Sequence, residues 1–197
     1  MTGKPPLIFV GDMLALDYLN TLVVLPDRTV DFIGDGESLL CWMQRTGMID
    51  EKDGATIRWH GSTHLLDEVA QRARNLREWF RSVARRRIQC AEAIDVHEVA
   101  WWLNPILRGD ATSTLLVPTD SGTCSPLQLR TIRRHACPST LEIALADMLA
   151  SFLVDAPWDS IRICASTGCR MMFLDATCDG GRTRCGSQLC ERAGDKR

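Results

Sequence analysis

CASTGC at positions 164–169 and CGSQLC at positions 185–190 are two cysteine pairs, each with four residues between its members, and fifteen residues separate the pairs. Two such pairs within thirty residues fit one tetrahedral Zn²⁺ held by four thiolates. The predicted ligands are Cys164, Cys169, Cys185 and Cys190. Four thiolates fill the coordination sphere of zinc and leave no position for water or substrate. The sequence therefore predicts a structural metal site, which contributes folding free energy to a segment too small for a core of its own.

The use of cysteine along the chain favours metal binding over disulfides. The chain has nine cysteines and no visible export signal, so we expect it in the cytoplasm, where thiols stay reduced. An odd number of cysteines also argues against complete pairing. Cys178 lies between the two pairs, either as a free thiol or as a replacement ligand in another arrangement. Disulfides among these cysteines are the remaining alternative.

The residues around the cysteine pairs predict a small hairpin. Ile161 to Cys164 and Met172 to Leu174 have the composition of short strands, and Thr177 to Arg182 has the composition of a turn. We therefore expect a ribbon that is closed at the metal.

The rest of the chain has the pattern of a multihelical domain with one β-hairpin. Its clearest element begins at Ser62 or Thr63 and carries an apolar stripe at helical spacing. The stripe consists of Leu66, Val69, Ala73, Leu76, Phe80 and Val83. Further helices are expected over 14–22, 37–46 and 94–107 and from Ser139 onward, a hairpin over 112–117 and 127–132, and an edge strand over 5–10. The segment 50–61 is polar and has no clear period. The predicted fold is mainly α with a small C-terminal zinc knuckle.

Positive charge is concentrated in one part of a chain whose formal net charge is −2. From Gln71 to Cys90 there are seven arginines and one acidic residue, Glu78. Arg74, Arg77, Arg81 and Arg85 fall on the side of the helix opposite the apolar stripe. This face is either a solvated surface of a core helix or a surface for nucleic acid or an acidic partner.

Two stretches carry a family resemblance. Gly11 to Thr21 (GDMLALDYLNT) resembles the opening of the ABATE domain, and Leu76-Arg77-Glu78 resembles its Leu-Arg-Glu-rich helix. The C-terminal stretch resembles the CGNR zinc finger through Cys164, Cys169-Arg170, Phe173-Leu174-Asp175, Arg182, Cys185 and Cys190. The resemblance implies a helical ABATE-like domain over 1–157 and a ribbon-like or treble-clef-like zinc knuckle over 158–197. It also implies a stress-induced transcriptional regulator whose knuckle binds nucleic acid.

The residues that name the CGNR family differ in this chain. Arg184 stands where the family has Trp, and Glu191-Arg192-Ala193 replaces Gly-Asn-Arg after the fourth cysteine. A surface for DNA, or for RNA, would then be made by Arg170, Arg182, Arg184 and Arg192. Glu191 would repel phosphate. A tetrathiolate zinc adds about −2, which brings the knuckle close to neutral.

Two other classes of function compete with nucleic-acid binding. In a non-enzymatic sensor or interaction module the zinc is only a structural clip, with Asp17 and Asn20 as candidate ligand-binding residues or with Cys137 and Cys178 as redox-active thiols. For Asn20 and Thr21 the alternative role is to satisfy nearby backbone groups. An enzyme is the least supported class, because the four histidines are scattered and no catalytic spacing is present. Trp101 and Trp102 fit a homodimer contact as well as a core position, and no segment is apolar enough for a membrane partner.

Overall fold

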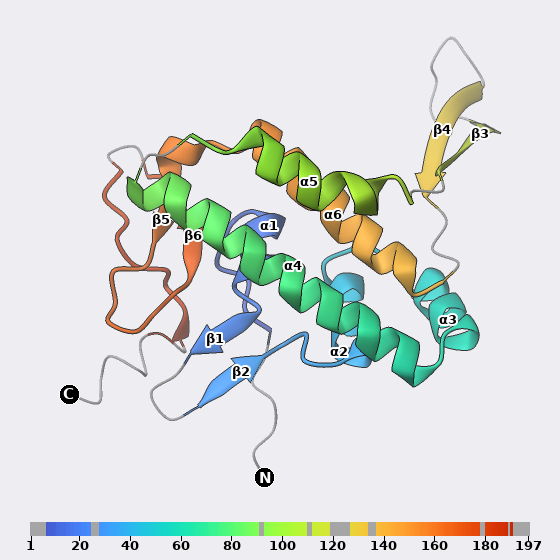
Figure 1. Cartoon of the computed structure of the whole chain (residues 1–197), viewed down its shortest axis with the longest axis horizontal. Coiled ribbons are helices and arrows are strands. Elements are labelled where there is room, and N and C mark those ends of the chain that lie inside the picture. The colour runs from blue at the N-terminus through green and yellow to red at the C-terminus, as the bar shows by residue number, and fades with distance from the viewer. Residues whose placement is uncertain are drawn as a thin grey trace.

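The computed structural model describes residues 7–24, 28–90, 93–109, 112–118, 127–133, 137–177, 180–188 and 190. Within these ranges the chain forms six α-helices, a short 3₁₀ helix and three two-stranded antiparallel sheets (Figure 1). The prediction of a mainly helical protein with a small hairpin is confirmed. None of the helices in these ranges combines the length and the apolar character that crossing a membrane requires.

The elements follow one another along the chain without long connections. The helices are α1 (Leu14–Leu19), α2 (Gly36–Arg45), α3 (Glu51–His60), α4 (Thr63–Cys90), α5 (Val96–Leu107) and α6 (Ser139–Asp155). The strands are β1 (Leu22–Val24), β2 (Thr29–Asp31), β3 (Thr112–Pro118), β4 (Leu127–Arg133), β5 (Ile161–Ile163) and β6 (Met172–Leu174). β1 pairs with β2, β3 with β4, and β5 with β6.

Helix α4 is the element on which the others pack. It has 28 residues and runs across the whole molecule (Figure 1). All six residues of the predicted apolar stripe are buried, and α1, α2 and α6 contact this helix. Phe80 of the stripe meets Phe152 of α6 edge-on, with 5.7 Å between ring centroids. The main hydrophobic core therefore lies along α4.

The ends of two helices show why the chain turns where it does. Asp35 caps α2 by accepting a hydrogen bond from the backbone N–H of Ser38 at 2.7 Å. Gly47, at φ +73°, follows this helix in the left-handed conformation that glycine adopts without strain, as the sequence predicts. Asp50 caps α3 by accepting from the N–H of Asp53 at 2.6 Å. This helix was not predicted, because only Gly54 and Ile57 of it are buried and so no apolar stripe marks it.

One predicted strand is not formed. Residues 7–10, the described part of the expected edge strand, pair with no other strand. The backbone N–H groups of Val10 and Gly11 instead donate to the Asp17 carboxylate, at 2.9 and 2.8 Å. A side chain of α1 thus uses the groups that a neighbouring strand would have needed.

The two central arginines of the arginine-rich face of α4 are buried. The prediction of a solvated surface and the prediction of a surface for nucleic acid or an acidic partner are therefore both wrong for these two residues. Arg77 is 2% exposed and Arg81 is 6% exposed. Arg77 makes two hydrogen bonds of 2.8 Å to the carboxylate of Asp31 and one of 2.9 Å to the Thr21 hydroxyl. Arg81 donates to Glu78 at 3.1 Å and to the carbonyl of Leu19. Together they fasten α4 to the end of α1 and to β2.

The hairpin of β3 and β4 matches the predicted pair of strands. In Figure 1 it projects from the helices at one end of the molecule, whereas β5 and β6 lie at the other end. The predicted turn between β3 and β4 falls mostly on residues 119–126, which lie outside the described residues.

Replacing Gly36 by Ala is expected to destabilise the protein by about 1–3 kcal/mol through overpacking. A Cβ at Gly36 would lie 2.4 Å from the Leu66 Cβ and 2.5 Å from the Leu66 carbonyl carbon, so α2 would have to move away from α4. Gly34→Ala is the control, because its Cβ would meet nothing closer than 3.5 Å. Urea unfolding of both variants tests this close contact, and equal stability of the two would contradict it.

Candidate metal centre

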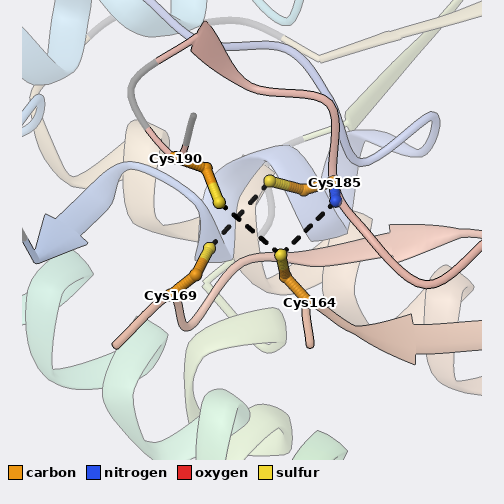
Figure 2. A group of neighbouring side chains, drawn as sticks. All are labelled: Cys164, Cys169, Cys185 and Cys190. Carbon is orange, nitrogen blue, oxygen red and sulfur yellow. Dashed lines mark hydrogen bonds between the residues drawn. The ribbon is translucent and has the colours of Figure 1, made fainter. Parts of the chain in front are cut away.

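The four cysteines predicted as ligands come together at one point (Figure 2). Their sulfur atoms all lie within 4.8 Å of one another. The Sγ atoms of Cys164 and Cys190 are 3.7 Å apart, and those of Cys169 and Cys185 are 3.9 Å apart. A tetrahedral site with Zn–S bonds of about 2.3 Å has edges of about 3.8 Å. The donor type, the donor number and these distances fit a tetrathiolate zinc.

Short turns place each sulfur. Cys164 follows β5 and continues its pairing, because its N–H donates to the carbonyl of Met171 at 2.9 Å. Gly168 (φ +79°) precedes Cys169, and Gly186 (φ +72°) follows Cys185. These left-handed residues reverse the chain next to a ligand, where a side chain would introduce strain. The predicted strands and hairpin of the knuckle are confirmed.

The thiols are poised to ionise in the presence of a cation. Hydrogen bonding from Cys169 lowers the pKa of the Cys185 thiol to about 5, whereas the same hydrogen bond together with burial raises the pKa of Cys169. Burial also raises the pKa of Cys190. The Cys185 thiolate therefore forms readily, whereas the thiolates of Cys169 and Cys190 need a compensating positive charge, which a bound metal ion would supply.

The cysteine cluster is covered by the N-terminal part of the chain. Cys164, Cys185 and Cys190 share a small second core with Met171 and Phe173. Val23 of β1, Val30 of β2 and Phe32 complete that core. Ile161 and Met172 of the knuckle belong instead to the main core along α4. The knuckle thus packs on one side against β1 and β2, which precede it by more than a hundred positions, and on the other side against the main core.

Hydrogen bonds of Gly11 and Asn20 join the N-terminal stretch 11–21 to β6, and we call this set of contacts the clamp. The side chain of Asn20 donates to the carbonyl of Met172 at 2.8 Å and accepts from its N–H at 2.9 Å, so this amide acts as a short strand. The N–H of Leu174 donates to the carbonyl of Gly11 at 3.0 Å. Asn20 is 1% exposed, so these are buried contacts.

Arg182 closes the clamp from the other side. Its guanidinium lies 4.4 Å from the centre of the Phe173 ring and donates to Asp12 at 2.7 Å. It also donates to the carbonyls of Arg184 at 3.2 Å and Cys185 at 2.9 Å. These contacts within the chain engage the side chain that the sequence suggested for nucleic acid.

The remaining residues predicted for the site differ in their exposure and contacts. Arg170 and Arg184 are exposed beside Cys169 and Cys185. Arg192, and Cys178 in the turn, lie outside the described residues. Asp17 and Asn20 both hydrogen-bond to backbone groups, and burial raises the pKa of Asp17 against the opposing effect of the two N–H groups. A ligand-binding role for these two residues stays a prediction.

Replacing Asn20 by Ala is expected to destabilise the protein by about 2–4 kcal/mol, because the buried N–H and C=O of Met172 both lose their partner. The same change should weaken metal binding, since Met172 lies between Cys169 and Cys185. The measurements are thermal melting and zinc competition against a chelator dye. Asn104→Ala, at an exposed position of α5, is the control. Unchanged zinc affinity in Asn20→Ala would show that the clamp and the metal site are independent.

The sequence predicted the cysteine cluster and singled out Asn20 and Arg182, but it did not show that Asn20 and Arg182 hold the knuckle in place. Asp12, Asn20 and Arg182 act between segments more than 150 positions apart. The only signal in the sequence was that polar residues interrupt the apolar N-terminal stretch.

Comparison with known proteins gives a family match over most of the chain. The family model ABATE, described as "Putative stress-induced transcription regulator", matches residues 12–156, which span α1 to α6. No curated protein matches the chain. The four clustered cysteines that follow the matched region are consistent with a zinc motif of the CGNR type. The chain belongs to the ABATE family.

Proposed function

We propose that this protein is a non-enzymatic transcriptional regulator that binds DNA through the surface of its zinc-holding knuckle. The zinc is structural in this proposal, because four thiolates leave no coordination site for chemistry. Its role is to fix the backbone from Cys164 to Cys190 in one conformation. The family description supports regulation of transcription, and the arginines of the knuckle support contact with a polyanion.

The observation that carries the proposal is the position of two exposed arginines directly beside metal ligands. Arg170 follows Cys169 and Arg184 precedes Cys185. Among the described residues neither arginine forms an ion pair, so both guanidinium groups can neutralise phosphates. Arg182 holds the carbonyl of Arg184 at 3.2 Å and thereby positions its neighbour. We assign phosphate contacts to Arg170, Arg184 and Arg192, and a positioning role to Arg182.

Fluorescence anisotropy with mixed-sequence duplex DNA, titrated through a range of salt, tests the proposal. Each phosphate contact contributes about 0.9 to the slope of log K against log salt. We expect the double variant Arg170→Ala, Arg184→Ala to lower this slope by about 2 and to weaken binding at low salt by tenfold or more.

The control has the same change in charge at another place. Arg45 ends α2 and Arg108 follows α5, and both are exposed. The double variant Arg45→Ala, Arg108→Ala should bind like the parent protein. Equal weakening by the two double variants would point to net charge rather than to the knuckle, and absence of binding at low salt would refute the proposal. Competition with single-stranded RNA of equal length decides between DNA and RNA.

A further inference from the structure

A groove of about 420 Å³ lies between α4, α5 and α6. Its apolar wall is formed by Leu76, Trp101, Trp102, Pro105 and Ile106. Pockets of roughly 300–1,000 Å³ with mostly apolar walls and a few polar groups are typical binding sites for small molecules. The groove belongs neither to the cysteine cluster nor to the arginines of the knuckle.

The aromatic wall is held in place before any ligand arrives. Trp102 stacks on Trp79 with 5.2 Å between ring centroids and 20° between planes, and the Nε1–H of Trp79 donates to Glu98 at 3.0 Å. Trp101 meets Trp102 edge-on, with 5.6 Å between centroids and 82° between planes. Trp101 is 72% exposed, so a large, mostly apolar side chain stands in solvent beside the groove. Burying that indole against a flat ring would be favourable.

The polar end of the groove is formed by Arg72 and Glu142, whose opposite charges cancel. The guanidinium group offers hydrogen-bond donors and the carboxylate offers an acceptor. Arg72 donates from Nε to the Glu142 carboxylate at 2.7 Å. This pair uses one of five guanidinium N–H groups and one carboxylate oxygen, and the described residues supply no further partner to either side chain. Pro105 has no N–H, so the carbonyl of Trp101, four residues earlier, loses its usual helical donor.

We propose that this groove binds a free, neutral, planar heteroaromatic molecule whose edge carries an N–H next to a carbonyl, as in a lactam. The ring stacks on Trp101 and meets Trp102 edge-on, because the two indoles are nearly perpendicular. Its carbonyl accepts from Arg72 and its N–H donates to Glu142. A carboxylate in the same place would face Glu142 and a cation would face Arg72, and like charges at close range are unfavourable. The site depends on neither the metal nor DNA, so it can be tested independently of the proposed function.

Isothermal titration calorimetry of the full-length protein with quinolin-2(1H)-one tests the inference. We expect saturable one-to-one binding, and weaker binding of quinoline-2-carboxylate. Trp101→Ala should weaken binding of quinolin-2(1H)-one at least tenfold. Trp59→Ala is the matched control, because Trp59 is 86% exposed on α3 and does not line the groove. Both variants remove an exposed side chain, so circular dichroism should show unchanged folding.

Glu142→Gln provides the second test. Without the carboxylate the polar end carries the net charge of Arg72, so the preference should reverse in favour of quinoline-2-carboxylate. Absence of saturable binding to the parent protein at millimolar probe would overturn the inference. Equal binding by Trp101→Ala and the parent, or an unchanged preference in Glu142→Gln, would do the same.

Discussion

Replacing Cys185 by Ser is expected to abolish stoichiometric zinc binding and to remove the folded structure of the knuckle. Structural zinc sites contribute an apparent binding free energy of about 10–16 kcal/mol, and that energy is coupled to folding of the segment that supplies the ligands. Cys185 is 1% exposed and lies 3.9 Å from the Cys169 sulfur, so a serine there leaves the metal with three thiolates in a buried site. Zinc content after gel filtration and thermal melting are the measurements.

The effect of Cys185→Ser should extend beyond the knuckle. Because Val23, Val30 and Phe32 share a core with the ligands, β1 and β2 should lose protection from hydrogen exchange together with β5 and β6. Cys41→Ser is the control, since Cys41 is an exposed cysteine of α2 outside the cluster. Loss of zinc without loss of protection in β1 and β2 would mean that the second core is stable without the metal.

Replacing Arg77 by Met is expected to destabilise the protein by about 3–5 kcal/mol, because it leaves the Asp31 carboxylate without its buried partner. The matched control lies on the same helix. Arg72 pairs with Glu142 at 2.7 Å at a side-chain exposure of 45%, and exposed pairs of this kind contribute about 0–1 kcal/mol. Urea unfolding of Arg77→Met and Arg72→Met compares the two pairs directly, and similar losses would contradict a special role for the buried one.

The same pair predicts a dependence on pH. Burial acts to raise the pKa of Asp31, but the hydrogen bonds and charge of Arg77 act in the opposite direction and outweigh it. The net shift of this pKa is therefore downward. A carboxyl group whose pKa is lower in the folded state stabilises the protein above its ordinary pKa, near 3.8, and loses that contribution as pH falls through the folded value. In Arg77→Met the hydrogen bonds and charge of Arg77 no longer lower the pKa of Asp31, so the difference in unfolding free energy between the parent protein and the variant should shrink as pH falls below about 3.8, which urea unfolding at a series of pH values measures.

The sequence was most informative where one residue type or one period decides the structure. The stripe from Leu66 to Val83 identified α4 because core helices repeat apolar residues at spacings of three and four. The cysteine spacing predicted the cluster of four thiols because few other structures require four thiols so close together. The hairpins of β3 with β4 and of β5 with β6 followed from short β-rich segments that flank turns, whereas the hairpin of β1 with β2 was not predicted.

What the sequence could not indicate are the contacts between polar groups that lie far apart along the chain. Arg77 and Arg81 occur in an arginine-rich face and look solvated, yet Asp31, Thr21 and the carbonyl of Leu19 make their burial favourable. The strand expected over residues 5–10 does not form over its described part, and the Asp17 carboxylate accepts hydrogen bonds from the N–H groups of Val10 and Gly11. Such preferences depend on tertiary neighbours rather than on local propensity.

Zinc K-edge X-ray absorption of the purified protein, together with its zinc content, is the most direct test of the metal centre. We predict one zinc per chain with four sulfur neighbours at about 2.3 Å and no oxygen or nitrogen neighbour. A first shell with fewer than four sulfurs, or a purified protein in which Cys164 and Cys190 or Cys169 and Cys185 are joined as disulfides, would contradict the tetrathiolate site.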